Sequence, residues 1–501
     1  MASQLYCNFL HLNKTVTPTF TDKPTELAHI EKQLHQLNHH ISNLFELRSA
    51  LLHRSNQLTS PVYIVPHEVL SYILNQAHEM KWLRPPPHNR QSIIPLQKAI
   101  VLSAVSRQWR QVAFGTSKLW ENVECQGSRQ LYKDSSMIIQ HCATYATSLN
   151  ISLYTQGHML DAADDPDVII TALSTSDVRR KLKSLKNTCC ELSPQWIQLL
   201  PSFLRLESLA IYGGNYPNID LGSLPLSWVS LSGATFESLT LPPSVQVLNL
   251  KDHSARLSIA LLYNCPRLIK FTSQPGPYSK AIIPSSPLVL DTLKKLMWSP
   301  AQSFVEAASA TKLEIPVIER LELSDSDKLQ CAPFTVLCHQ ISASLEHLTL
   351  KSFSLYNESS EFWQQFFKFP IPKLRKLSLV DWEHNVMTPA ILALTPGEDE
   401  DGYRDRSLPN LEYLCINSLG FYDGPYSFDS KVLELVKRRR IGEDSPFHLD
   451  FSFSFQDYGG VQATWRPEIM QEFQEFLANR PVEITMAGWE VTLDQLTRLV
   501  Q

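Results

Sequence analysis

One stretch of the chain begins like a zinc-protease motif. His67 and Glu68 start an H-E-x-x-H pattern, but Ser71 stands where the second zinc-binding histidine is required. The phosphate-binding patterns G-x-G-x-x-G and G-x-x-x-x-G-K-S/T and the nucleophile elbow G-x-S-x-G do not occur in the sequence. Because these motifs would supply a metal, a phosphate cradle or an activated serine, we expect a protein that is not an enzyme, with no catalytic residue, no metal and no cofactor.

The charge and the apolar content of the sequence limit the kinds of partner and the cellular compartment that we expect. The 501 residues include 45 Lys and Arg against 50 Asp and Glu, a formal net charge of -5, which disfavours a dedicated nucleic-acid-binding protein. No apolar stretch approaches the ~18 residues of a membrane span, and no basic cluster precedes an apolar run near residue 1. We therefore expect no membrane segment and a cytoplasmic or nuclear location. The nine cysteines form no C-x-x-C pair and are predicted to be reduced thiols.

Residues 22–59 have the apolar pattern of one long helix. Apolar side chains recur in alternating steps of three and four, at heptad positions a and d: Leu27, Ile30, Leu34, Leu37, Ile41, Leu44, Leu51 and Leu58. We predict a coiled-coil-like helix that either forms a homodimer with a second copy or folds back on its own chain, because Arg48 and Ser55 at later a positions weaken the seam. His35 and His39 fall at the outer positions b and f, so we interpret them as solvated side chains rather than metal ligands.

Two shorter helical patterns follow within residues 60–123. The first starts at Pro66, which suits the first turn of a helix, and its apolar face consists of Val69, Leu70, Ile73 and Leu74. The second has its apolar residues at Leu102, Val105, Trp109, Val112 and Ala113, ahead of Leu119 and Trp120. A helical unit this small buries too little surface to be secure alone, so a partner is expected to cover it. The alternative is that its apolar residues pack under the following domain.

The order of these patches resembles an F-box, in particular the fungal kind that a helical segment precedes. The matching stretches are Val65-Pro66-x-Glu68-Val69-Leu70-x-x-Ile73-Leu74, then Val105-Ser106-x-x-Trp109-Arg110-x-Val112-Ala113, then Leu119-Trp120. Val65 replaces the usual leucine, Leu74 the usual aromatic residue and Ser106 a common cysteine. The resemblance implies docking onto the Skp-type adaptor of a cullin-RING ubiquitin ligase, with Trp109 as support, through Val65, Pro66, Glu68, Val69, Leu70, Ile73, Leu74, Val105, Trp109, Leu119 and Trp120.

Residues 145–501 contain a repeated L-x-x-L-x-L pattern in which other apolar residues can replace leucine. Copies begin at Leu206, Val245, Leu293, Ile318, Leu345, Leu374 and Leu411, with looser copies at Leu182 and Leu268. Most of the spacings resemble the ~20–29-residue period of leucine-rich repeats, which predicts one strand per copy in an α/β solenoid. The asparagine that usually follows the strand is absent, so we expect an irregular solenoid with varied closing turns. Unrelated amphipathic strands in an α/β domain are the alternative.

The side chains between the buried leucines are predicted to share the concave face of this solenoid, because successive residues of a strand point to opposite sides. The residues expected to bind a target there are Lys251, Arg320, Glu322, His347, Lys351, Lys376 and Tyr413. Since lysine and arginine hold anionic groups by charge-assisted hydrogen bonds, we expect an acidic or phosphorylated protein segment as partner. An ordinary solvated face is the alternative.

The function implied by the F-box resemblance is that of a substrate receptor in a cullin-RING ubiquitin ligase. The helical unit would bind the adaptor, and the repeats would hold the protein target close to the ubiquitin-loading enzyme, so that proximity replaces chemistry. The competing hypothesis is a scaffold that dimerises through residues 22–59 and holds another protein without ubiquitin transfer.

Overall fold

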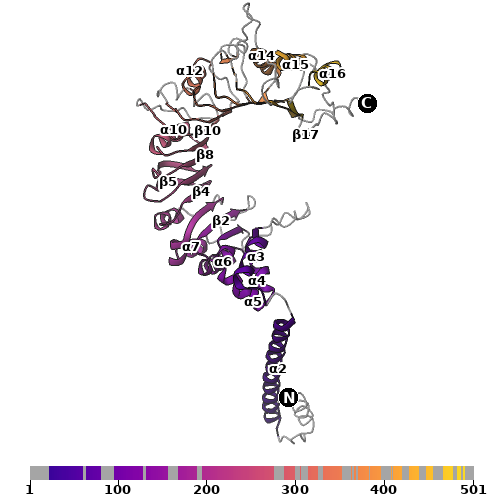
Figure 1. Cartoon of the computed structure of the whole chain (residues 1–501). Helices are drawn as coiled ribbons and strands as arrows, with labels where there is room; N and C mark the ends of the chain where they lie inside the picture. Colours follow the sequence, from indigo (N-terminus) through magenta and orange to yellow (C-terminus); the bar gives the residue numbers. More distant parts are fainter. Residues whose placement is uncertain are drawn as a thin grey trace, which may run out of the picture. The chain divides into compact units, whose positions relative to one another are not determined.

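The computed structural model of the chain is mixed α/β, with a long N-terminal helix and a large parallel sheet (Figure 1). It describes residues 22–59, 64–79, 95–127, 131–155, 167–188, 195–275, 287–299, 305, 314–324, 331–352, 363, 366–367, 371–382, 384–395, 408, 410–419, 428–438, 447–454, 467–477, 482–486 and 489–490. Residues 60–63 and 80–94 of the predicted F-box segment, and the cysteines Cys7, Cys189 and Cys190, lie outside these ranges.

The chain divides into two compact units. The first comprises residues 1–84 and 100–115, and the second comprises residues 85–99 and 116–501. The predicted long helix and most of the predicted F-box segment therefore fall in one unit. Residues 116–144, which the sequence did not assign to the repeats, belong to the unit that holds the sheet.

The predicted long helix is confirmed as α2, Lys23–Thr59. Pro24 lies in its first turn, where the missing N–H costs no hydrogen bond, and Glu26 complements the positive end of the helix dipole. No residue of α2 is buried, so the described part of the chain leaves its apolar seam uncovered. Its histidines bond along the helix surface instead: the His39 ring, for example, lies 3.4 Å from the amide nitrogen of Asn43.

Three shorter helices follow, α3 (His67–Glu79), α4 (Pro95–Ala104) and α5 (Arg107–Gly115). The Ser106 hydroxyl caps α5, because it accepts a hydrogen bond of 3.1 Å from the Trp109 backbone N–H. Within the first unit, α3 and α5 contact each other, and their buried side chains are Leu70, Leu74, Val112 and Ala113.

The second unit is built on a sheet of 15 described strands, all parallel except for the last pair. In spatial order they are β1 (Asn122–Gly127), β2 (Leu149–Thr155), β3 (Leu182–Asn187), β4 (Ser208–Tyr212), β6 (Trp228–Ser232), β8 (Val247–His253), β9 (Lys270–Pro275), β10 (Lys295–Trp298), β11 (Arg320–Ser324), β12 (His347–Lys351), β13 (Lys376–Trp382), β14 (Tyr413–Leu419), β15 (Phe447–Ser454), β16 (Val482–Met486) and β17 (Trp489–Glu490). Every L-x-x-L-x-L copy contributes one of these strands, as predicted.

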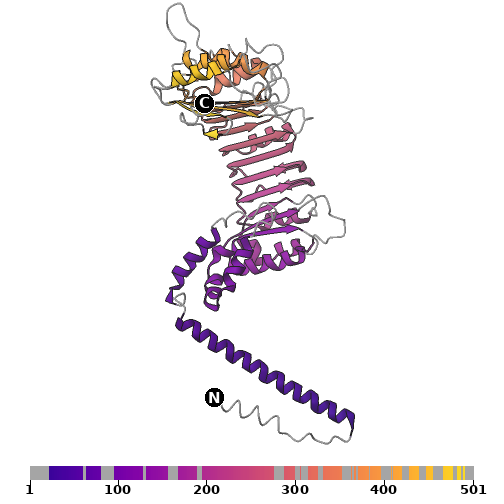
Figure 2. The ribbon, with the colours of Figure 1, turned by 90° about the vertical axis from the view of Figure 1, so that its right-hand side faces the viewer.

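The remaining elements of the second unit precede β1 or connect the strands. They are the helices η2 (Ser117–Trp120), α6 (Leu131–Tyr145), α7 (Asp167–Leu173), α8 (Ser176–Lys181), α9 (Gln195–Leu199), η3 (Leu200–Ser202), α10 (Ala255–Asn264), α12 (Cys331–Ile341), α14 (His384–Leu394), α15 (Phe428–Arg438) and α16 (Pro467–Leu477), and the separate strand pair β5 (Asn215–Asp220) and β7 (Thr235–Thr240). Helices α12, α14, α15 and α16 lie on one side of the later strands, as both ribbon views show (Figures 1 and 2).

The leucines of the repeats form the core on the helix-covered side. In β11, Leu321 and Leu323 are buried, and Leu348 and Leu350 stand opposite them in β12. The alternate residues of each strand point to the other side of the sheet, which we call the open face.

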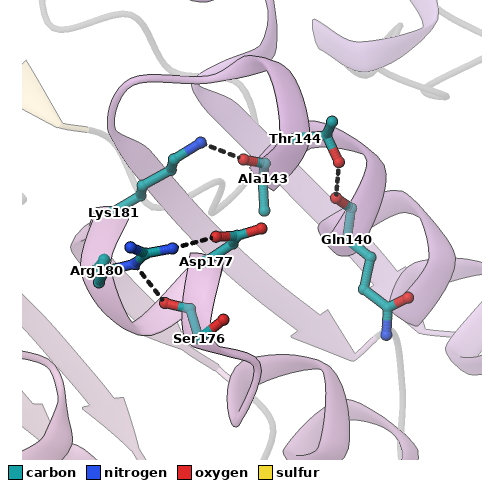
Figure 3. Close-up of polar contacts among 7 residues, drawn as sticks. All are labelled: Gln140, Ala143, Thr144, Ser176, Asp177, Arg180 and Lys181. Atoms are coloured by element: carbon teal, nitrogen blue, oxygen red, sulfur yellow. Dashed lines mark hydrogen bonds and ion pairs between the residues drawn. The ribbon is translucent and has the colours of Figure 1, made fainter.

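A lysine ties the start of this sheet to the preceding helices. The Lys181 ammonium at the end of α8 donates a 2.6 Å hydrogen bond to the backbone carbonyl of Ala143 in the last turn of α6 (Figure 3). Such a bond satisfies a carbonyl that lacks a partner within its own helix. On the same helix, Arg180 and Asp177 pair at 2.7 Å, and both are exposed. This hydrogen bond therefore fixes the position of Lys181, the residue directly before β3.

The strand ends turn through left-handed backbone in place of the missing asparagine. Five described residues at these turns have positive φ: Gly213 (69°), Gly214 (91°), Gly233 (62°), Asp252 (62°) and Ser352 (56°). The backbone N–H groups of Gly213, Gly233 and Ser352 each donate to a carbonyl of the next strand, at 2.7, 2.9 and 2.8 Å. Backbone conformation thus closes these turns, at a cost of ~1–2 kcal/mol for each residue that is not glycine.

We expect Gly214→Ala to destabilise the second unit by more than ~2 kcal/mol. Gly214 has a φ of +91°, and an added Cβ would overlap the hydroxyl of Tyr216, whose ring is buried and stacks on Phe236 at 5.9 Å. Gly233→Ala is the matched control, because its φ is also positive but the nearest atom to its Cβ is 3.9 Å away. Urea unfolding followed by circular dichroism measures both losses. Equal losses would show that the overlap with Tyr216 contributes nothing.

Candidate functional site

Five basic side chains stand next to one another across consecutive strands of the open face. The strand register pairs Lys270 with Lys295, Lys295 with Arg320, Arg320 with His347, and His347 with Lys376. We call these five residues the basic row. Neighbouring parallel strands lie ~4.8 Å apart, so the row brings the charges of Lys270, Lys295 and Arg320 close together, an arrangement that is unfavourable for folding.

The row has no ion pair of its own at three of its positions. Within the described residues, no acidic side chain lies within salt-bridge distance of Lys270, Lys295 or Arg320. The ion pairs of this region involve the residues just before the strands instead, with Lys294 bound to Glu319 at 2.7 Å and Arg375 near Glu412 at 3.8 Å. The cations of the row therefore remain available to a ligand.

One acid, Glu322, lies on the open face beside the row. Burial raises its pKa, whereas the charges of Lys351 and Lys270 act in the opposite direction. Lys351 ends β12 and Lys251 lies near the end of β8, both two positions beyond the central open-face residue of their strand. Glu322 thus offsets part of the positive charge without pairing directly with the row.

An aromatic and acidic group closes the row at β14 and β15. The Lys376 ammonium lies 3.9 Å from the centre of the Tyr413 ring, a cation–π contact, and Tyr413 stacks on His448 at 4.7 Å with an interplanar angle of 9°. The Tyr413 hydroxyl donates a 2.9 Å hydrogen bond to Asp450. Burial and this bond raise the pKa of Tyr413, and burial, with the charge of Asp450, raises the pKa of Cys415 to about 11.

The structure brings together most of the residues predicted for target binding and adds two. Arg320, His347 and Lys376 belong to the basic row, while Lys270 and Lys295 were not predicted. Lys270 is the third residue of the loose copy that begins at Leu268, in which Ser273 replaces a leucine. The buried Ser273 hydroxyl donates a 2.9 Å hydrogen bond to the Ser258 hydroxyl. Lys270 and Lys295 both occupy the third position of a repeat copy, so a prediction that included this position in every copy would have contained them.

Helix α3 of the first unit has two distinct apolar faces. Leu70 and Leu74 are 1% and 0% exposed, whereas Val69, Tyr72 and Ile73 are 48%, 64% and 42% exposed. Pairs four apart share a helix face, so one face lies in the core and the other is open. Pro66, just before the helix, and Glu68, in its first turn, are exposed, and Val65 is half-buried.

This burial corrects part of the predicted adaptor surface. Leu70 and Leu74 support the helix from inside and cannot touch a partner without unfolding. Leu119 and Trp120 are also buried and belong to the second unit, where Trp120 contacts His141 and Tyr145 of α6 at 5.4 and 5.8 Å. Leu119 and Trp120 were correctly predicted as apolar contact residues, but they pack within this chain and not against an adaptor. Val105 stays exposed and Trp109 is half-buried.

A second basic feature lies beside α8. A hollow of about 680 Å³ is lined by residues that include Arg179, Arg180, Lys181 and Arg205. Asp177 also lines the hollow and pairs with Arg180, and Lys181 is bound to the Ala143 carbonyl. Its positive charge is therefore less concentrated than that of the basic row.

The described residues contain no group of three or more histidine, cysteine, aspartate and glutamate side chains arranged to hold a metal ion. Among them, too, no helix has the length and apolar character needed to cross a membrane. A scan of the chain against protein-family models found no match, and a search of the curated proteins found none either.

The charges of the row should be visible in the titration of His347. Burial and then Arg320 lower its pKa, as do Lys376 and Arg375, while Glu346 raises it. Replacing Arg320 by glutamine removes a cation that opposes the imidazolium, so the pKa of His347 should rise toward its ordinary ~6.5. Proton NMR of the imidazole measures the midpoint of the titration. The His347→Gln variant identifies the signal that belongs to His347, and Arg267→Gln is the control variant. An unchanged midpoint in Arg320→Gln would show that the row does not act on His347.

Proposed function

We propose that the protein is the substrate receptor of a cullin-RING ubiquitin ligase. Helix α3 and its neighbours would dock on a Skp-type adaptor in the manner of an F-box, and the parallel strands would form irregular leucine-rich repeats that hold a protein target. The observation that carries the proposal is the open apolar face of α3, with Val69, Tyr72 and Ile73 all more than 40% exposed.

Such a face favours a protein partner over solvent. Side chains of this kind contribute ~1.5–3 kcal/mol each when they leave water, and a helix that already buries Leu70 and Leu74 inside its unit has no internal use for a second apolar face. Val105, ahead of α5, is exposed as well. The sequence motif and the burial pattern therefore favour the same docking element.

The receptor would act by position alone. A target held on the open face of the strands would remain near the ubiquitin-loading enzyme, which raises its effective concentration there. The residues that hold the target need only bind, so the proposal requires no catalytic group in this chain.

We expect Val69→Glu combined with Ile73→Glu to weaken binding to a purified Skp-type adaptor by at least ~100-fold, because two charges would enter an apolar contact. Isothermal titration calorimetry with the full chain measures this. The control is Leu204→Glu, which replaces an exposed apolar residue of the second unit by the same charge.

Circular dichroism should show that all three proteins fold equally, since none of the three positions is buried. Absence of adaptor binding by the unaltered protein, or equal binding by the double variant, would contradict the proposal.

A second candidate function is that of a dimeric scaffold, which the uncovered seam of α2 favours. Its apolar seam runs from Leu27 to Leu58, between four and five heptads, and coiled coils need three or four. At ~1.5 Å per residue the seam is ~47 Å long. Arg48 interrupts it at one a position, so the first half of α2 should contribute most of the stability.

Sedimentation of the full chain should therefore reveal a dimer that Leu37→Glu with Leu44→Glu converts to a monomer. His35→Glu with His39→Glu places the same charges at the outer positions and should leave the dimer intact. A monomeric unaltered protein would exclude this scaffold, and a dimer that also binds the adaptor would join both functions in one assembly.

A further inference from the structure

We infer that the basic row binds a run of closely spaced anionic side chains on an extended protein segment, and that Lys270 and Lys295 are binding residues in it. This inference rests on the proposed function, because it names the class of segment that the receptor holds. The anionic side chains are aspartate, glutamate or phosphorylated serine, which share the chemistry that lysine and arginine recognise.

The first support is the alignment of five basic residues without an acid among them. Like charges directly opposite one another in a sheet are unfavourable for its stability. The nearby acids are accounted for elsewhere: Glu319 is bound to Lys294, and Glu412 lies near Arg375. Glu346 lies before β12 and Glu322 lies in the next open-face position of β11.

The second support is the length of the row. From Lys270 to Lys376 the row crosses four inter-strand steps of ~4.8 Å, about 19 Å in all. An extended segment advances ~3.3 Å per residue, so about six residues cover this distance. A single carboxylate or phosphate would reach only one or two of the cations, which is why the row fits a run of anionic side chains.

The third support is the way the row ends. Beyond Lys376, the ring of Tyr413 supports the ammonium from one side, and its hydroxyl is bound to Asp450. The carboxylate of Asp450 repels an acidic ligand. The anionic part of the segment should therefore end over β13, and the residues that follow it should be neutral or basic.

The same features favour a protein segment over a nucleic acid. Proteins that bind single strands combine positive charge with aromatic side chains on which bases stack. From β9 to β12 the open-face positions of the row and of the neighbouring register hold no phenylalanine, tyrosine or tryptophan, and the acid Glu322 lies beside the centre of the row. The ring of Tyr413 is already covered on one side by His448.

Fluorescence anisotropy with the full-length protein tests the inference. The probes are a labelled peptide of eight glutamates, a peptide of equal charge that carries phosphoserines, a peptide of eight glutamines and a single-stranded oligothymidine of equal charge. Saturable binding of either anionic peptide that weakens as salt is raised, with no binding of the glutamine peptide, is the expected result; the tighter of the two anionic peptides identifies the source of the charge.

Lys270→Glu with Lys295→Glu should weaken the binding of the anionic peptides at least tenfold, which corresponds to ~1.4 kcal/mol. Arg267→Glu with Lys373→Glu is the matched control, because it makes the same change of charge in exposed turns ahead of β9 and β13 and should change affinity less than twofold. Circular dichroism verifies that both variants fold.

Three results would overturn the inference: no binding of either anionic peptide, equal loss in both double variants, or tighter binding of the oligothymidine than of the peptides. None of these depends on the adaptor. If the row fails while the α3 face binds the adaptor, the proposed receptor holds its target elsewhere; if adaptor binding fails while the peptides bind, the basic row remains as the site of a different kind of protein.

Discussion

The register of the parallel strands is the constraint on which the rest of the second unit depends. Leu321 stands opposite Leu348, and Leu348 opposite Leu377, and all three are buried. A slip of one residue would turn these leucines to solvent and basic side chains into the core, so the register is strongly determined. The position before each leucine is aligned as a consequence. The like charges of the basic row are held together by the hydrophobic core and not by attraction among themselves.

The two proposed binding surfaces depend on different interactions, one on apolar contact and the other on charge. The open face of α3 offers apolar side chains, whose removal from water contributes affinity but little dependence on salt. The basic row offers charges that are largely exposed, which contribute modest affinity for each pair, faster association and discrimination by sign. A receptor with this division would hold its adaptor persistently through one surface and exchange targets through the other.

Much of this arrangement could be predicted from residue spacing. The steps of three and four in residues 22–59 predicted α2, and the L-x-x-L-x-L copies predicted β3, β4 and β8 to β14. Periodicity could not separate Leu70 from Val69, because each has an apolar partner four residues later, Leu74 and Ile73, and only packing against α5 decides which of the two faces is covered. Lys270 was not predicted because Phe271 and Ser273 occupy two of the leucine positions in its copy of the repeat.

By itself, the sequence determined that residues 22–59 form a helix, that each repeat copy forms a strand and which positions of those strands are buried, because these follow from local periodicity and the burial of apolar side chains. Only the tertiary structure decided which side chains become neighbours. Leu119 and Trp120 follow the helical segment in sequence yet pack with α6, and Lys295 meets Arg320 only through strand pairing. Such neighbours are set by contacts between residues far apart along the chain, and no local pattern encodes those contacts.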